Sequence, residues 1–321
     1  MRYILAVDAG GSKCDAILLR ENGTALGWGH VEAPAPGAAA RLGAGRDPRA
    51  MAAAMRQAVG DRYLDELYLL GAGAFLPENS LQPDRLGSVH FSHGMEVEPA
   101  YVLMREEDGL VAIAGTGAVV HGRTRDGKRV HLDGVGPLLG DNGGGYGIGL
   151  EGLRMAARSF MHPRHATSLT AALALALGFP APCSLDAFVL YMLEAHDRSE
   201  IARLAAVVDR QAREGDAVAR KILLHAADAL AETAWDAIDH LGIAREEYPV
   251  IGMGSVATGS DIFWLRVCDD VAAFAPNMRF LRLNHPPVFG MALIGLRQCG
   301  VADTAELRNR FFESAYNVGA G

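Results

Sequence analysis

Short apolar runs bounded by turn residues fill the first 130 residues, and the pattern then changes to longer helical stripes. Residues 3–7 form an apolar run of strand-forming side chains, and a second run begins at Ala16. Because a glycine pair separates these runs, the pattern predicts a β-hairpin and not a strand that feeds a helix. The same reasoning predicts further strands at residues 24–31, 67–70, 88–92, 110–114, 119–122, 129–132, 249–253 and 280–283.

Helices are expected where apolar residues recur every three or four positions. Asp47 and Pro48 suit an N-cap and a first helical position, and they follow a loop at residues 33–45 that is rich in Ala, Pro and Gly. The remaining helical patterns cover residues 47–59, 149–242 with breaks near 178–180 and 215, 287–299, and 304–312. The whole is a mixed α/β pattern in which strand, glycine turn and strand occur twice, so we expect a duplicated architecture.

Length and charge narrow the class of protein. A chain of 321 residues exceeds the usual single domain, so two domains are expected. The formal net charge is −8 and no basic run occurs, which argues against a nucleic-acid partner. No apolar stretch approaches the roughly 20 residues that span a bilayer, and the N-terminus enters a strand directly, so we expect no membrane partner and a cytoplasmic location.

Metal-binding cysteine motifs are absent from the sequence. The four cysteines are widely scattered and no CxxC pair occurs, so neither a zinc site nor an iron–sulfur cluster within one chain is expected.

The first glycine turn is a candidate phosphate site. Asp8 ends the first predicted strand, and Gly10 and Gly11 follow it. Backbone N–H groups without neighbouring side-chain bulk can converge on an anion, and a carboxylate beside them can hold hydrated Mg²⁺. Neither a Walker loop nor a dinucleotide fingerprint is present, since both need their glycines to open a helix. An ordinary β-turn would produce the same pattern, so this turn alone leaves both readings open.

A second glycine cluster surrounds Asp141 and Tyr146. Residues 134–147 hold seven glycines, which is too many for a regular element and too localised for disorder. This density predicts a backbone that packs closely against a ligand.

Four motifs occur in order along the chain. They are Asp-x-Gly-Gly-Ser-Lys at residues 8–13, Ala-Gly-Thr-Gly at 114–117, Leu-Gly-Asp-x-Gly-Gly-Gly-Tyr-x-Ile-Gly at 139–149, and Gly-Ser-Val-Ala at 254–257. Together they resemble the actin-like ATPase superfamily of sugar kinases and actin. The resemblance is closer to the BadF/BadG/BcrA/BcrD-type ATPase family, which includes N-acetylglucosamine and glucosamine kinases.

The resemblance implies two ribonuclease-H-like (actin-like ATPase) α/β domains with ATP in the cleft between them. The expected domains are residues 1–108 and residues 109–302, the second with a helical insertion. A C-terminal helix at about residues 303–321 is expected to pack on the first domain. A possible homodimer is also implied.

The resemblance also assigns roles to individual residues. Asp8 is directed to Mg²⁺, and Asp141 hydrogen-bonds sugar hydroxyls, with Gly140 and Glu98 beside the sugar. Glu98 and Asp141 are the expected catalytic carboxylates. The expected ATP-binding residues are Gly10, Gly11, Ser12, Lys13, Gly115, Thr116, Gly117, Gly254, Ser255 and Ala257.

Several residues depart from the family pattern. The kinases carry an aspartate base at the start of the helix before the second domain, whereas here the nearest equivalent is Glu98, directly before Pro99. Glutamate places its oxygens about 1.5 Å further out, which can cost about 10²-fold in rate when positioning supplies the catalysis. A helix-capping role for Glu98 stays open. Asn142 replaces a glutamate, Ser255 a glycine and Cys14 a threonine.

These observations favour an ATP-dependent kinase of an amino sugar, with ATP and Mg²⁺ as cofactors and a small sugar as substrate. One alternative is an ATPase that drives a conformational change in a protein partner. The other is a nucleotide or sugar sensor that has lost the catalytic base.

Overall fold

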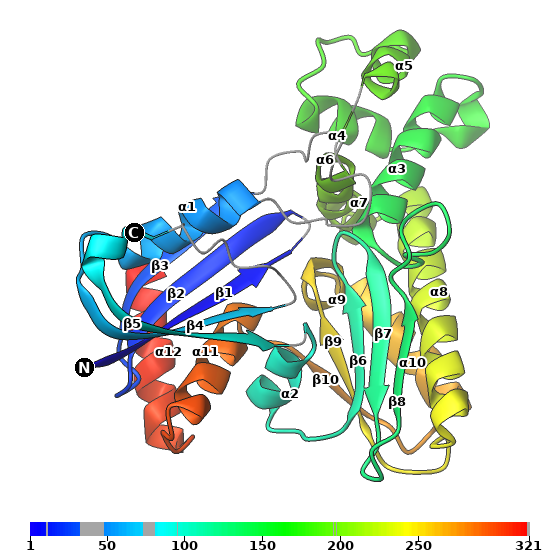
Figure 1. Ribbon diagram of the computed structural model, residues 1–321. Helices are drawn as coiled ribbons and strands as arrows, with labels where there is room; N and C mark the ends of the chain where they lie inside the picture. Colours follow the sequence, from blue (N-terminus) through cyan, green and yellow to red (C-terminus); the bar gives the residue numbers. More distant parts are fainter. Residues whose placement is uncertain are drawn as a thin grey trace. The chain divides into compact units, whose positions relative to one another are not determined.

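The computed structural model describes residues 1–10, 12–32, 48–72, 81–94, 96–194, 196 and 198–319 (Figure 1). The expected loop at residues 33–45 lies outside the described residues, as do Gly11, Asp47 and Met95. Two compact units emerge from the packing of the chain. Unit 1 comprises Met1–Arg105 and His285–Gly321, and unit 2 comprises Glu106–Asn284.

Unit 1 is built on a five-stranded mixed sheet in the order β3-β2-β1-β4-β5. β1 pairs antiparallel with β2 and parallel with β4, and the opening hairpin is confirmed. The residue before the turn, Ala9, pairs with Cys14 just after it. The strands are β1 (Arg2–Ala9), β2 (Lys13–Arg20), β3 (Ala25–Glu32), β4 (Leu64–Ala72) and β5 (Leu86–Gly94).

Helices cover both faces of this sheet. On one face, α1 packs on β2 and β3 so closely that a Cβ at Gly29 would lie 1.9 Å from the Ala54 carbonyl oxygen. On the other face, α11 crosses β1 and β4, where a Cβ at Gly295 would lie 2.5 Å from an Ile4 methyl group. The helices of unit 1 are α1 (Pro48–Val59), α2 (Glu98–Met104), α11 (Pro287–Gln298) and α12 (Ala305–Gly319), with a short 3-10 turn, η2 (Pro83–Arg85).

The position of α11 differs from the expected domain boundary. The sequence placed residues 285–302 in the second domain, whereas the structure assigns them to unit 1. The reason is packing, because α11 lies against β1, β4 and α2, and its buried face includes Phe289 and Leu293. A Cβ at Gly290 would lie 2.5 Å from the Pro99 carbonyl oxygen, so α11 and α2 are in direct contact. Sequence periodicity identifies such a helix but not the sheet that it covers.

Unit 2 repeats the topology of unit 1. Its sheet has the order β10-β9-β6-β7-β8, with β6–β7 and β7–β8 antiparallel and β6–β9 and β9–β10 parallel. Counted from its own first strand, unit 2 has the same strand order and directions as unit 1, which confirms the expected duplication. The strands are β6 (Gly109–Ala114), β7 (Ala118–Arg123), β8 (Arg129–Asp133), β9 (Pro249–Met253) and β10 (Arg279–Arg282).

A long helical segment separates β8 from β9, as expected for residues 149–242. It is coloured green to yellow in Figure 1, and α8 packs on β7 and β8 and against α10. The segment contains α3 (Gly145–Ser159), η3 (Pro163–His165), α4 (Leu169–Ala176), α5 (Leu185–Leu193), α6 (Arg198–Arg203), α7 (Ala205–Arg213) and α8 (Ala217–Leu241). Two helices, α9 (Ser255–Gly259) and α10 (Asp261–Phe274), follow β9.

Candidate functional site

The glycine turn of unit 1 joins the carboxyl end of β1 to β2. The Gly10 N–H donates to the Lys13 carbonyl at 2.9 Å, which closes the turn. Asp8 lies on β1 directly opposite Asp15 on β2, so the two carboxylates share one face of the sheet. Asp8 is partly exposed, whereas the Asp15 side chain is only 2 % exposed. The structure therefore places a carboxylate beside this turn, and the metal role of Asp8 stays a prediction.

The charge of buried Asp15 is compensated by three neighbours, a network that sequence reasoning did not identify. Lys13 Nζ lies 3.0 Å from one carboxylate oxygen, and His30 Nδ1 (2.7 Å) and Trp28 Nε1 (3.1 Å) contact the other. Burial alone would raise the pKa of the Asp15 carboxyl. The Lys13 charge and the hydrogen bonds from His30, Lys13 and Trp28 instead hold this pKa below its usual value. Lys13, expected at the phosphates, is thus held by Asp15 in this structure.

Glu98 begins α2 at the same edge of the unit 1 sheet. β1, β4 and β5 run parallel, so their carboxyl ends meet at one edge, and α2 starts four residues after β5. Asp8 and the end of β5 are two strand spacings apart, about 10 Å. Glu98 is the first helical residue and Pro99 the second, so an acidic side chain faces the positive helix end. The arrangement is compatible with both roles expected for Glu98.

The second glycine turn and the Gly-Ser-Val-Ala motif come together in unit 2. Gly115–Gly117 follows β6, and Gly254 follows β9, the parallel neighbour of β6. A Cβ at Gly115 would lie 3.9 Å from the Gly254 Cα. Gly254 has φ +93°, and a Cβ there would lie 2.4 Å from the Ala114 carbonyl oxygen, so only glycine fits. Ser255 and Ala257 begin α9, so these motif residues share the carboxyl edge of the sheet, where α/β folds bind ligands.

The glycine segment after β8 packs directly on the Gly115–Gly117 turn. The Gly145 N–H donates to the Gly115 carbonyl at 2.8 Å, and the Tyr146 N–H donates to the Thr116 carbonyl at 3.0 Å. A Cβ at Gly144 would lie 2.7 Å from the Gly117 backbone. Two segments about 30 residues apart in sequence thus pack together at the edge of the unit 2 sheet.

Asp141 belongs to the segment that packs on the turn, and its side chain lies against Gly117. A Cβ at Gly117 would lie 2.6 Å from the Asp141 carboxyl carbon, so the carboxylate occupies the space that the glycine leaves. Asp141 has φ +59°, a left-handed conformation that needs support from its neighbours. That support comes from Asp133, whose carboxylate accepts hydrogen bonds from the backbone N–H groups of Gly134, Asp141 and Asn142 at 2.8, 2.5 and 2.9 Å.

Asp133 and Arg198 are the residues of this site that sequence reasoning missed. Asp133 ends β8, and its carboxylate also explains Gly140, where a Cβ would lie 2.1 Å from the Asp133 Oδ1. Arg198, the first residue of α6, forms an ion pair with Asp141 through Nη2 and Oδ2. A strand that ends in an aspartate before Gly-x-Gly offers a signal for Asp133. No local pattern marks Arg198, because it follows Asp141 by 57 residues.

Several of the dense glycines permit close contacts inside unit 2, and the close approach of a ligand stays a prediction. In unit 2 they permit contacts between parts of the protein, as the Gly140 and Gly144 contacts show. Gly143 lies against α8, where a Cβ would be 2.8 Å from the Ala226 carbonyl oxygen. Gly149 lies against α6, where a Cβ would be 2.0 Å from the Ile201 carbonyl oxygen. These contacts account for four of the glycines, whereas a Cβ at Gly136 would meet no described atom within 4 Å.

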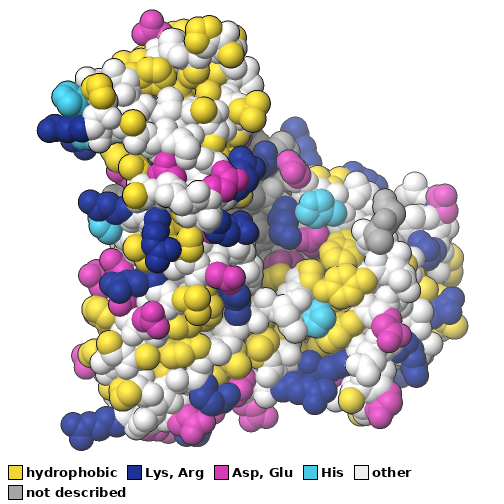
Figure 2. Space-filling view, turned by 180° about the vertical axis from the view of Figure 1, so that it is seen from behind, with side chains coloured by type: hydrophobic (Ala, Val, Ile, Leu, Met, Phe, Trp, Pro, Cys, Tyr) yellow, Lys and Arg dark blue, Asp and Glu magenta, His cyan; other side chains and the backbone are white. Residues whose placement is uncertain are grey.

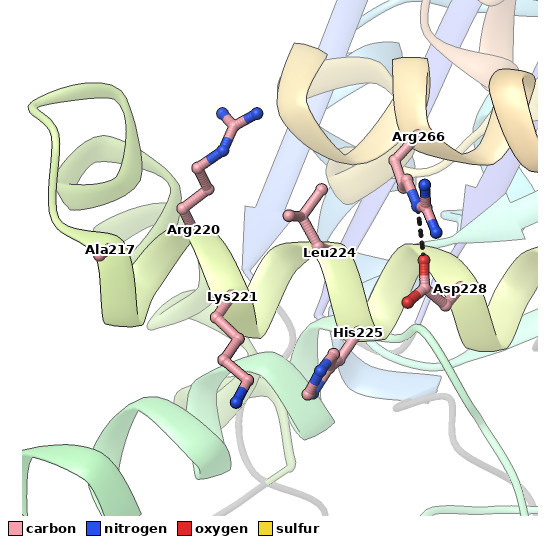
Figure 3. Close-up of a pocket in the computed structure, with 7 residues that line it drawn as sticks. All are labelled: Ala217, Arg220, Lys221, Leu224, His225, Asp228 and Arg266. Carbon is pink, nitrogen blue, oxygen red and sulfur yellow. Dashed lines mark hydrogen bonds and ion pairs between the residues drawn. The ribbon is translucent and has the colours of Figure 1, made fainter.

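Two other surface features are built from different residues. A concave surface on α8 and α10 is lined by Arg220, Lys221, His225 and Arg266. Figure 3 shows Arg220 pointing away from Lys221 and His225. Arg266 Nε donates to an Asp228 carboxylate oxygen at 2.7 Å. The cations do not converge on one point. Hydrophobic side chains also gather on the helical segment (Figure 2). The exposed apolar residues of α4 and α5 are Leu175, Val189, Leu190, Met192 and Leu193.

Potential metal ligands in the described part of the chain are scattered and not clustered. No three His, Cys, Asp or Glu side chains are placed there to hold a metal ion together. Burial raises the pKa of the Cys268 thiol to about 12 and that of Cys299 to about 11, so both stay protonated at neutral pH. None of the described helices has the length and apolar character needed to cross a membrane.

Curated relatives of this chain include sugar kinases. It is 24% identical over 197 residues to an N-acetylmuramic acid/N-acetylglucosamine kinase from Clostridium acetobutylicum, a match that covers 61% of this chain and 63% of the relative. It is 32% identical over 191 residues to an N-acetyl-D-glucosamine kinase from Dictyostelium discoideum, which covers 59% of each. The matches therefore span about six tenths of these relatives.

Solved structures share the fold over nearly the whole chain. A candidate N-acetylglucosamine kinase from Chromobacterium violaceum matches with a TM-score of 0.62 at 20% identity, covering 92% of this chain and 99% of that protein. A ROK family glucokinase from Streptomyces griseus, solved with glucose and AMPPNP, matches with a TM-score of 0.57 at 16% identity, covering 92% and 98%. These likenesses confirm the expected two-domain, actin-like ATPase fold. The family model of the BadF/BadG/BcrA/BcrD ATPase family matches residues 5–265, and the chain belongs to this family.

Proposed function

We propose that this protein is an ATP-dependent kinase that phosphorylates a hydroxyl of an amino sugar such as N-acetylglucosamine or glucosamine. The family is one of ATPases, and the two curated relatives are named as kinases of N-acetylglucosamine or of N-acetylmuramic acid and N-acetylglucosamine. One observation carries the proposal. The carboxylate of Asp141, proposed to bind sugar hydroxyls, lies against Gly117 in the turn proposed to bind phosphate, and both lie in unit 2.

The proximity of Asp141 and Gly117 suits phosphoryl transfer to an alcohol. Such transfer depends mainly on positioning and on neutralisation of phosphate charge, so the acceptor hydroxyl must be held close to the γ-phosphate. Asp141 would bind sugar hydroxyls with Gly140 beside it, while Gly115, Thr116 and Gly117 would contact phosphate. Gly254, Ser255 and Ala257 would contact the adenosine.

The residues of the unit 1 turn fit a phosphate-bound Mg²⁺. Mg²⁺ in such enzymes takes one or two carboxylates, waters and phosphate oxygens, so a single aspartate can suffice. Asp8 has this role in the proposal, because its opposite partner Asp15 is buried and already compensated by Lys13. Bound Mg²⁺ would neutralise phosphate charge, and Gly10, Gly11, Ser12 and Lys13 would surround the phosphates.

Glu98 is the proposed base for the sugar hydroxyl. Removal of a general base slows the chemical step, so Glu98→Gln should lower kcat by about 10²–10⁴-fold with little change in the KM for sugar. Glu98→Asp, which places the shorter carboxylate on the same helix start, should keep activity or increase it. Normal turnover by Glu98→Gln would leave Glu98 as a helix-end carboxylate only.

A coupled ADP-release assay tests the proposal as a whole. ADP release is measured across hexosamines, their N-acetyl derivatives and hexoses, with a control without sugar. We expect release that depends on an amino sugar. Release that is independent of sugar would instead indicate an ATPase acting with a protein partner. Binding of nucleotide or sugar without any release would indicate a sensor.

A further inference from the structure

Asp141 sits in an environment that demands a charge partner. Its side chain is 8 % exposed, and an ionised carboxylate with so little access to water is costly unless it is paired and hydrogen-bonded. The Asp133 carboxylate binds the backbone N–H of Asp141 and adds a second negative charge nearby. Within the described residues, the cation paired with the Asp141 carboxylate is Arg198.

The route by which Arg198 reaches Asp141 is built into the packing of two helices. Arg198 begins α6, and Ile201, one turn later, is 4 % exposed and packs on α3. The close approach requires Gly149, because a Cβ there would lie 2.0 Å from the Ile201 carbonyl oxygen. α3 in turn begins at Gly145, which is bonded to the Gly115–Gly117 turn. The Arg198 backbone is thus fixed to the same helix that follows Asp141.

The ion pair with Arg198 uses one carboxylate oxygen of Asp141 and leaves the other available as a hydrogen-bond acceptor. Arg198 Nη2 donates to Oδ2, and no described residue is hydrogen-bonded to Oδ1. The charge-assisted hydrogen bond at Oδ2 fixes the orientation of the carboxylate. Oδ1 can then accept a hydrogen bond from a sugar hydroxyl, and the Asp141 side chain loses no further conformational freedom when the sugar binds.

We propose that Arg198 is a positioning residue for the sugar site, which orients the Asp141 carboxylate and compensates its charge from α6. This proposal rests on the function proposed above, because it takes Asp141 as the sugar-binding carboxylate. Arg198 would set the affinity for the amino sugar and leave the affinity for MgATP unchanged. Helix α6 then belongs to the sugar site, although its sequence carries no family motif.

The test combines kinetics with a double-mutant cycle. Arg198→Met should raise the KM for the amino sugar by about 10- to 100-fold, the value of a hydrogen bond to a charged group, with the KM for MgATP within about twofold of the parent. Arg198→Lys should recover part of this loss. Arg210→Met, which removes an exposed arginine from neighbouring α7, is the control and should leave both KM values unchanged. In an Asp141→Asn background, Arg198→Met should add little, because its target is already altered.

A second readout needs no substrate and separates this proposal from the proposed function. The urea midpoints of Arg198→Met, Asp141→Asn and the double variant should be non-additive, because the two side chains share one interaction. Additive midpoints would show that the contact does not exist and would overturn the proposal even if the protein is an amino-sugar kinase. An unchanged KM for sugar in Arg198→Met, or an equal rise for sugar and MgATP, would overturn it as well. A parent protein inactive on every amino sugar would overturn the proposed function, and the positioning role with it.

Discussion

The two glycine turns occupy the same place in two sheets of the same strand order, but they differ in what surrounds them. After β1, the nearest atom to a Cβ at Gly10 is the Lys13 carbonyl oxygen at 3.6 Å, an ordinary contact. After β6, a Cβ at Gly117 would lie 2.6 Å from the Asp141 carboxyl carbon. The first turn has only an ordinary contact at Gly10, whereas the second is packed at Gly117 by a segment that returns from β8.

Each turn also has a buried aspartate with a basic partner. The two aspartates, Asp15 and Asp141, differ in how many of their carboxylate oxygens are already bonded. Asp15 has Lys13, His30 and Trp28 around its carboxylate, so both of its oxygens are used within unit 1. Asp141 has Arg198 on one oxygen. A carboxylate with both oxygens bonded inside the protein stabilises the fold, whereas a carboxylate with one oxygen left to accept a hydrogen bond can bind a ligand. One topology thus supports a structural aspartate in unit 1 and a candidate binding aspartate in unit 2.

The largest expected effect is the loss of activity on substitution of Gly117, compared with substitution of Gly10. Gly117→Ala should lower kcat/KM for the sugar by about 10²-fold or more, because the new methyl group must displace the Asp141 carboxylate by a distance near 1 Å. Gly10→Ala should leave the free energy of unfolding within about 0.5 kcal/mol of the parent, since its methyl group meets no close atom. Steady-state kinetics and urea unfolding of both variants provide the comparison. Parent-like kinetics for Gly117→Ala would show that Asp141 does not act from the observed position.

A smaller effect is expected for the structural aspartate. Asp15→Asn should lower the free energy of unfolding by about 1–3 kcal/mol, because charge-assisted hydrogen bonds to His30, Lys13 and Trp28 weaken in a buried place. Asp61→Asn is the matched control, since the Asp61 side chain is 99 % exposed and its pair with Arg85 should contribute little. Equal stability of the two variants in urea unfolding would contradict the structural role of Asp15.

The smallest expected effect is a pH dependence from unit 2. Burial, and secondarily the charge of His131, lowers the pKa of His121 to about 4. The unfolded chain, with a histidine pKa near 6.5, therefore binds more protons between pH 6.5 and 4, so stability falls as the pH drops through this window. The contribution has a slope of at most about 1.4 kcal/mol per pH unit. His121→Gln should reduce the slope and His162→Gln, at an exposed position, should not; equal slopes would contradict the assignment.

Much of the fold was predictable from the sequence because its strands are short apolar runs that end at glycines. The hairpin at β1–β2, the repeat at β6–β7 and the strand at residues 249–253 follow from local pattern alone. The unit that α11 joins was not predictable, because a helix with an apolar stripe can cover either sheet, and the contacts of Gly290 and Gly295 decide between them.

From the sequence, only those residues of the candidate site that lie in a recognisable motif could be predicted. Asp8, Asp141 and the glycines were identified through family motifs, and the structure brings Gly115–Gly117, Asp141 and Gly254 to one edge of the unit 2 sheet. Arg198 and Trp28 were not identified, because each acts through a contact made by folding. The packing roles of Gly140 and Gly144 were also hidden, since a glycine that admits a ligand and a glycine that admits a neighbouring protein atom look alike in sequence.

In the proposed site, the two aspartates serve different ligands: Asp8 would bind the metal–nucleotide, and Asp141 would bind the sugar. Calorimetric titration of MgADP and of N-acetylglucosamine into the parent, Asp8→Asn and Asp141→Asn tests it most directly. Asp8→Asn should weaken MgADP binding and leave the Kd for sugar within about twofold, and Asp141→Asn should do the reverse, by about 10-fold or more for the affected ligand. Two variants that weaken the same ligand, or neither ligand, would contradict the account.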